Sequence, residues 1–145
     1  MNRSHLSNPT RSRLVDQLVF LDEQMTMYLD SYPSLQRTQV HKSIQHYVKI
    51  LERLLELDDV NLVKTLNKVT VIGSNITICY DGEGSHELFT VVLPTDIDPD
   101  HNRISLFSPL GNQLLSRSTG ETFVLQTPEA EYSVRIVGTT LTNND

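Results

Sequence analysis

The sequence predicts an α+β fold in two parts, an N-terminal antiparallel helical hairpin and a C-terminal antiparallel sheet with one helix. Three observations lead to this prediction. Apolar residues recur at steps of four and three as far as residue 54, in two runs separated by Pro33. After Asn67 the chain becomes rich in β-branched residues and glycine-containing turns. A proline-started segment at 109–117 then interrupts the strands, as a short helix would.

Two apolar seams with heptad spacing flank Pro33 and predict the hairpin. Because proline resists a continuous helix, the break at 30–34 predicts a turn between two antiparallel arms. The sequence therefore predicts a flexible tail over 1–11 and a helical hairpin, a short coiled coil, over 12–66. The first seam comprises Leu14, Leu18, Leu21, Met25, Tyr28 and Tyr32, and the second comprises Val40, Ile44, Tyr47, Leu51 and Leu54.

The second half of the chain alternates strand-like runs with turns. Its runs are rich in β-branched and apolar residues, and glycine, proline and acidic residues separate them. These features predict a small sheet domain over 67–141, followed by a frayed end at 142–145. The strand-like runs cover 69–80, 87–94, 103–107, 121–128 and 131–141.

Charge is distributed unevenly over the 145 residues. Residues 1–66 contain eight basic and eight acidic side chains, whereas 67–145 contain four basic and ten acidic ones and carry the whole net charge of −6. Because a nucleic-acid binder needs a basic face to neutralise phosphates, this pattern argues against direct, sequence-specific binding of DNA or RNA. It favours a partner protein with a basic or mixed surface.

The sequence carries no signal for export or membrane insertion. The single cysteine, Cys79, cannot form an internal disulfide. No apolar run approaches the ~18 residues of a membrane span, and residues 1–13 lack the apolar core of a signal peptide. We therefore expect a cytoplasmic protein without a membrane partner.

The motifs in the chain do not indicate an enzyme or a resident metal. Asp96, Asp98 and Asp100 have the spacing that begins a calcium loop, but His101 and Phe107 stand where that loop needs glycine and glutamate. The five histidines lack zinc-site spacing. No nucleophile elbow or phosphate-binding glycine loop is present. We expect no enzymatic activity of the chain itself and no cofactor.

The segment 96–128 resembles the C-terminal domain of the bacterial Gre transcript-cleavage factors. Residues 71–78 are similar to the glycine-bearing first strand of that domain, and the resemblance extends over 69–141. It implies an FKBP-like fold for this domain, with a helical hairpin before it. The matching features are Asp98-Pro99, Ile104-Ser105, Ser108 to Gly111, Leu114-Leu115, Gly120-Glu121 and Thr127-Pro128.

The resemblance implies a protein that binds RNA polymerase. In Gre factors and in relatives such as the regulator of nucleoside diphosphate kinase family, the C-terminal domain docks on a coiled coil of the largest subunit, at the rim of the secondary channel. The hairpin points into the channel, and in cleavage factors two acidic residues at its tip help to hold a metal ion at the polymerase active site. The partner-binding residues that the resemblance implies are Ser108, Pro109, Leu110, Leu114, Asp96 and Asp98.

The hairpin departs from that of the cleavage factors in two respects. It is shorter, and its tip offers Asp30 alone where those factors carry an acidic pair. In the second half, Ser116-Arg117 stands where the family often has Gly-Lys. We therefore expect a transcription regulator that binds the polymerase without cleaving RNA, and that modulates elongation or competes with cleavage factors.

Three alternatives stay open at this point. A genuine transcript-cleavage elongation factor would use Asp30 as its candidate catalytic and metal-binding residue, with Mg²⁺ only at the polymerase active site. A prolyl isomerase would be consistent with an FKBP-like fold, although the chain has no Trp and only four Phe to line such a pocket. A coiled-coil adaptor would use the heptads to pair two chains.

Overall fold

The computed structural model describes residues 3–141, with side chains from residue 9 onward. The chain divides into two compact units, residues 1–65 and 66–145. The first is helical, and the second is built on a five-stranded sheet, which confirms the predicted α+β class. None of the described helices combines the length and hydrophobicity that a membrane span requires.

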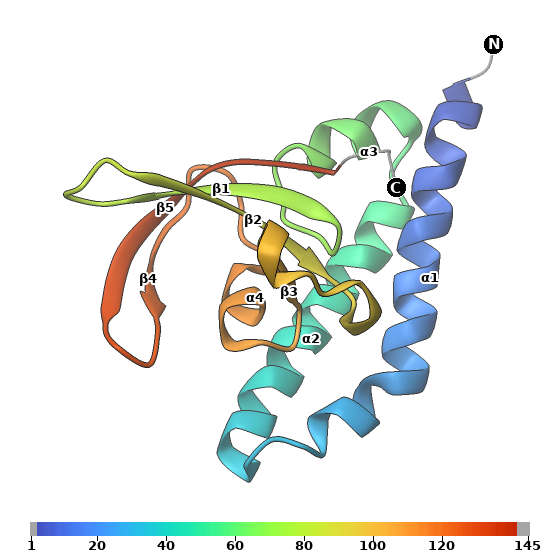
Figure 1. Ribbon diagram of the computed structural model, residues 1–145. Coiled ribbons are helices and arrows are strands. Elements are labelled where there is room, and N and C mark those ends of the chain that lie inside the picture. Colours follow the sequence, from blue (N-terminus) through green and yellow to red (C-terminus); the bar gives the residue numbers. More distant parts are fainter. Residues whose placement is uncertain (1–2, 142–145) are drawn as a thin grey trace. The chain divides into compact units, whose positions relative to one another are not determined.

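Unit 1 is built on an antiparallel pair of helices, α1 (Arg3–Leu29) and α2 (Ser34–Leu55), joined by a turn at 30–33 (Figure 1). All five residues of the second predicted seam are buried. In the first seam Leu14 and Leu21 are buried, and the other four members are half-buried. The heptad spacing therefore identified the face along which the two arms pack.

A buried polar residue of α1, Gln17, contacts a member of the second seam. Gln17 is buried, and its Oε1 accepts a hydrogen bond of 2.5 Å from the hydroxyl of Tyr47, which is also buried. A buried amide needs such a partner, because an unpaired polar group inside a protein costs free energy. The seam therefore combines apolar packing with one buried polar contact between α1 and α2.

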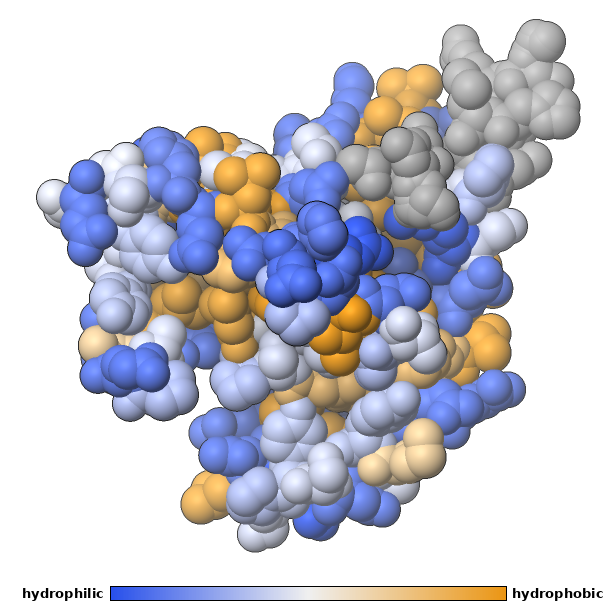
Figure 2. Space-filling view, in the orientation of Figure 1, coloured by the Kyte–Doolittle hydropathy of each residue, from blue (hydrophilic) through white to orange (hydrophobic). Residues whose placement is uncertain are grey.

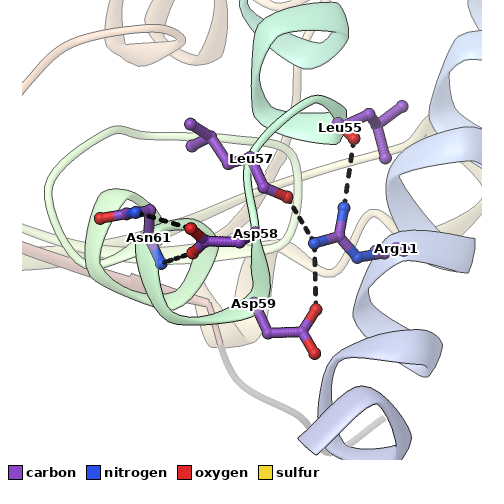
Figure 3. A network of polar contacts seen from close by, with 6 residues as sticks. All are labelled: Arg11, Leu55, Leu57, Asp58, Asp59 and Asn61. Carbon is purple, nitrogen blue, oxygen red and sulfur yellow. Dashed lines mark hydrogen bonds and ion pairs between the residues drawn. The ribbon is translucent and has the colours of Figure 1, made fainter.

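The first turns of α1 correct the predicted flexible tail, since residues 3–11 are helical. Arg11 links this part of α1 to the end of α2 and the start of α3 (Figure 3). Its Nη1 donates to the carbonyl of Leu55 at 3.2 Å, and its Nη2 donates to the carbonyl of Leu57 at 2.6 Å. The same Nη2 lies 3.0 Å from Asp59 Oδ1. The last carbonyls of a helix lack partners within it, so Arg11 caps the end of α2.

A third helix, α3 (Asp59–Leu66), lies inside the range that the sequence assigned to the hairpin alone. Asp58 precedes it and accepts the main-chain N–H of Asn61 at 2.8 Å, as an N-cap residue does (Figure 3). This N–H is the main reason why the pKa of Asp58 is lowered. Leu62 on α3 is fully buried.

Unit 2 contains a mixed sheet of strand order β3-β2-β1-β5-β4. The predicted antiparallel arrangement is wrong at one edge, where β3 runs parallel to β2. The reason is the connection between them: 3₁₀ turns η1 (Pro94–Asp96) and η2 (Pro99–His101) return the chain so that it re-enters the sheet in the same direction. The strands are β1 (Ser74–Tyr80), β2 (His86–Val92), β3 (Arg103–Ser105), β4 (Thr122–Gln126) and β5 (Glu131–Leu141).

The sheet curls around the short helix α4 (Pro109–Leu114), as Figure 1 shows. A β-bulge in β5 places Gly138 and Ile136 opposite the consecutive residues Thr77 and Ile78, so that Val137 has no partner on β1. The bulge changes which alternate side chains of β5 are buried. Before the bulge the even-numbered Ile136 is buried, and after it the odd-numbered Thr139 is buried. The predicted frayed end at 142–145, like residues 1–2 of the predicted tail, lies outside the described residues. The fully buried side chains of unit 2 include Ile76, Ile78, Val91, Leu106, Leu114, Val134 and Ile136.

Candidate docking surface

The predicted partner-binding residues of unit 2 gather around β3, the short strand at one edge of the sheet. β3 contacts η1 and η2 before it and α4 after it. The acidic loop and the Ser-Pro segment, which the sequence analysis treated as separate features, therefore both contact the same edge strand. We call Asp96, Asp98, Ser108, Pro109 and Leu110 the β3-edge surface.

Ser108 is the N-cap of α4. Its Oγ accepts the main-chain N–H of Gly111 at 3.0 Å and donates to the carbonyl of Ser105 at 2.7 Å. Pro109 follows as the first helical residue and is exposed, and Leu110 is half-buried. The Ser108 hydroxyl is thus engaged in the fold, whereas Pro109 presents its ring to solvent.

Leu114 corrects one part of the predicted partner surface. It is fully buried, and Leu115 is 4% exposed. Leu114 lies on the face of α4 that packs into the core, and Leu115 follows the helix as its C-cap. Leu114 therefore supports the surface from the core side instead of contacting a partner. Gly111 is buried on the same helix, where an added Cβ would lie 2.0 Å from the carbonyl oxygen of Ser105.

The acidic loop presents charge and one apolar side chain. Asp96 is exposed, and the carboxylate of Asp98 lies 2.7 Å from Nδ1 of His101. The main chain of Asp98 exchanges two hydrogen bonds of 3.0 Å with Arg103, which close the loop onto β3. Ile97, between the two acids, is 47% exposed. The sequence analysis missed Ile97, although an isoleucine inside a run of acids and turn residues was the available signal.

Hydrophobic side chains such as Ile97 interrupt a largely hydrophilic exterior. Figure 2 shows hydrophobic residues scattered among hydrophilic ones over the visible face. A single exposed apolar residue is common on protein surfaces. Ile97 differs from such an isolated residue because two members of the β3-edge surface, Asp96 and Asp98, flank it directly.

The segment after α4 is held by Arg117. Its guanidinium lies 3.8 Å from the ring centroid of Phe123, and its Nη1 pairs with Glu121 Oε2 at 2.6 Å. Burial acts to raise the pKa of Glu121, but the Ser118 N–H and Arg117 together outweigh it, and the pKa is lowered. Arg117 is therefore committed to contacts within unit 2.

The hairpin tip in unit 1 offers one carboxylate. Asp30 is exposed directly after α1, and no other acid lies within residues 26–38. The guanidinium of Arg37 stabilises the turn itself: its Nε donates to the carbonyl of Leu29 at 3.1 Å and its Nη2 donates to that of Tyr32 at 2.9 Å. Over the described part of the chain, no three His, Cys, Asp or Glu side chains are grouped as a metal site would need.

A protein-family model described as "Transcription elongation factor, GreA/GreB, C-term" matches residues 65–140, more than half of the chain. The chain belongs to the GreA/GreB family. In this GreA/GreB family member the matched range coincides with unit 2, so the unit that carries the β3-edge surface is the unit that the family model describes. The hairpin tip with Asp30 lies outside that range.

Two curated relatives are proteins named "Transcription elongation factor GreA". That of Bacillus cytotoxicus is 36% identical over 69 residues, which cover 48% of this chain and 44% of the relative. That of Roseiflexus sp. (strain RS-1) is 30% identical over 102 residues, which cover 70% of this chain and 63% of the relative. The GreA/GreB family member described here thus spans about half to three fifths of the length of these relatives.

A solved structure has the same fold. It is described as a prokaryotic transcription elongation factor GreA/GreB from Nitrosomonas europaea, and it matches with a TM-score of 0.56 at 23% identity. The match covers 81% of this chain and 90% of that chain. This likeness supports the fold of the GreA/GreB family member and carries no statement about its activity.

Proposed function

We propose that this chain is a transcription elongation factor that binds RNA polymerase through the β3-edge surface. The observation that carries the proposal is the family match to unit 2, together with an exposed Pro109 and an exposed Asp96 at one sheet edge. The names of the relatives favour an elongation factor over the non-cleaving regulator expected from the sequence.

We further infer where on the polymerase the chain binds. Its FKBP-like unit 2 docks on the coiled coil of the largest polymerase subunit at the rim of the secondary channel, and it does so in the cytoplasm. The net charge of −6 carried by the second half of the chain supports a basic partner surface. The chain supplies no reaction of its own and acts through the polymerase.

A second candidate, regulation without transcript cleavage, is favoured by the tip of the hairpin. Asp30 is the only carboxylate there, and one carboxylate makes a poor site for a divalent cation, which takes about six oxygen ligands. The residues at the tip therefore do not fit a magnesium site by themselves, and no step of the proposal depends on one.

Binding is tested by retention on immobilised core RNA polymerase. Pro109→Glu changes the exposed first residue of α4 while leaving the Ser108 cap intact, and a carboxylate is well tolerated in the first turn of a helix. We expect this variant to lose most of its retention. His86→Glu adds a charge at an exposed site on β2 and serves as the matched control. Equal retention of wild type and Pro109→Glu would exclude the β3-edge surface.

Cleavage is tested separately, with a backtracked elongation complex. Release of short RNA by the wild type, lost in Asp30→Ala and kept in Asp16→Ala, would support a cleavage factor. Retention on the polymerase without RNA release would support the second candidate. A chain that neither binds the polymerase nor alters RNA release would refute both.

A further inference from the structure

A groove runs between the two arms of the hairpin, on one side of unit 1. Its volume is about 720 Å³, and the residues that line it belong to α1 and α2. A groove of this size accepts several side chains of a partner. Its floor is apolar, because it contains Leu18, Met25 and Val48. These three residues are half-buried, so that packing between the arms leaves part of each side chain open to solvent.

The apolar floor of the groove continues along α1 toward the start of the helix. Val15 and Val19 are 45% and 47% exposed. Val15 lies two helical turns before Asp22, a lining residue of the groove, so both residues stand on the same side of α1. Val19 lies one turn after Val15. An exposed apolar strip bordered by charged residues marks a site of protein association.

The two walls of the groove differ in charge. Asp22 is the ionisable lining residue of the α1 wall, whereas the α2 wall carries Lys42, His46, Lys49 and Glu52. All five side chains are exposed, and within the described residues none of them forms an ion pair. Residues 14–29 contain three acids and no lysine or arginine, and residues 34–55 contain four lysine or arginine residues and one glutamate. The groove therefore lies between an acidic arm and a basic arm.

Asp22 and Lys42 stand at the same level of the hairpin, on opposite walls. Gln17 on α1 contacts Tyr47 on α2, and Asp22 and Lys42 each lie five residues from this pair in the direction of the tip. Equal steps along two antiparallel helices reach the same level, because the rise per residue is the same. One acid and one base therefore border the same part of the apolar floor.

The opposite charges of the walls decide which partner fits. A polyanion would meet Asp22 on one wall, and a basic helix would meet Lys42 and Lys49 on the other. A second copy, related by a two-fold axis parallel to the hairpin, would lay its α1 on α2 and its α2 on α1. Asp22 would then face the partner's Lys42, and by symmetry the pair would form twice.

Glu52, the one acid on the α2 wall, is compatible with this arrangement. It lies ten residues from Lys42 in the direction of the open end, which is the level of Ser12 on α1. Residues 9–15 contain two arginines and no acid. Glu52 would therefore meet no like charge on a second copy.

We propose that the groove between α1 and α2 is a self-association surface, through which two copies of this chain pair as a four-helix bundle. The apolar floor supplies affinity, and the pairing of Asp22 with Lys42 fixes the orientation. This contact differs from pairing through the heptad seams, because the arms of one chain already pack along those seams. The proposal concerns unit 1 and does not rest on polymerase binding.

The test is the mass of the full chain in solution, measured by sedimentation equilibrium. Concentrations between about 1 µM and about 1 mM cover the range of moderate and weak dissociation constants. We expect the mass to rise with concentration from 16.5 kDa toward twice that value. A mass that stays at 16.5 kDa throughout would overturn the proposal.

Charge reversal shows whether the groove is the contact. Asp22→Lys and Lys42→Asp each bring like charges together twice in the pair, and each should weaken association about tenfold. The double variant restores opposite charges and should associate as the wild type does. Asp16→Lys, an equal charge change at an exposed site of α1 outside the groove, should leave association unchanged. Single variants that associate like the wild type, or a double variant weaker than both, would overturn the proposal.

The same variants distinguish a second copy from a nucleic acid. If the groove bound single-stranded RNA, Asp22→Lys would strengthen binding of a fluorescent oligonucleotide and Lys42→Asp would weaken it. For self-association, in contrast, both changes act in the same direction. Opposite effects on RNA binding, together with a constant monomer mass, would assign the groove to RNA and overturn the proposal.

Discussion

Gly111 shows how closely α4 approaches β3. The added Cβ of an alanine would lie 2.0 Å from the Ser105 carbonyl oxygen. The Cβ is fixed by the main chain of α4 and the oxygen belongs to the main chain of β3, so neither can move cheaply. We expect Gly111→Ala to lower the free energy of unfolding by about 3 kcal/mol, the upper range for overpacking. Gly138→Ala is the control, because its Cβ meets nothing within 4 Å. Urea denaturation measures both, and equal midpoints would contradict the close approach.

Ser116 is a strained residue in the segment that follows α4. Its φ of 72° lies in the left-handed region, and its Oγ is buried without a hydrogen-bond partner among the described residues. Glycine adopts this conformation freely. Ser116→Gly should therefore raise the free energy of unfolding by about 1 kcal/mol.

Ser116→Ala separates the two causes of this strain, since it removes the hydroxyl but keeps the left-handed backbone. We expect it to gain less than Ser116→Gly, as measured by thermal unfolding. If Ser116→Gly is less stable than wild type, the backbone at this position is not the source of strain.

Residue-scale prediction succeeded where one residue type has one local effect. Pro109 was expected in the first turn of a helix, and it is the first residue of α4. The burial of Leu114 and the exposure of Ile97 depend on how α4 and the acidic loop pack against β3. Those contacts are made by residues distant in sequence, so that spacing alone did not separate core from surface.

At the scale of elements, Arg11 joins the start of the hairpin to its end. Arg11→Met removes three hydrogen-bonding contacts and leaves the carbonyls of Leu55 and Leu57 without their donor. We expect a loss of about 2 kcal/mol, with faster amide exchange concentrated in α3. Arg53→Met serves as the control, because Arg53 is exposed in the last turn of α2. Unchanged exchange in α3 would show that Arg11 does not hold this end of the hairpin.

The turn between α4 and β4 should respond to pH through Glu121. Its pKa in the folded chain is lowered below the ordinary value of 4.5. A lowered pKa means that the carboxylate stabilises the fold above about pH 4.5 and that this contribution is lost as the pH falls through the folded pKa. Urea midpoints of wild type and Glu121→Gln should therefore converge at low pH. Curves that stay parallel down to pH 3 would contradict this assignment.

Element-scale prediction was correct for the long, periodic segments and wrong where the chain turns. The seams that define α1 and α2 repeat over many residues, and each repeat adds evidence for the same face. By contrast, α3 is eight residues long. The parallel pairing of β3 depends on the path of the loop through η1 and η2, which hydrophobic periodicity does not describe.

At the scale of the whole molecule, the two units differ in charge, and the difference should appear in the salt dependence of polymerase binding. If the β3-edge surface faces basic residues, added salt screens the attraction, and affinity falls between about 0.05 and 0.5 M NaCl. Asp96→Asn should weaken binding and flatten this dependence. Asp16→Asn, an equal charge change at an exposed site on α1, should do neither. A salt dependence that Asp96→Asn leaves unchanged would remove Asp96 from the interface.

The Arg11 contacts determine which positions of the hairpin are free to vary among related sequences. Two of the three acceptors are main-chain carbonyls, at Leu55 and Leu57, and every amino acid supplies a carbonyl. Descendant sequences are therefore free to vary at positions 55 and 57 without losing the contact, while position 11 is not. Correlated substitution would link position 11 to position 59 alone. Methods that infer contacts from paired changes would thus overlook two of the three contacts that Arg11 makes.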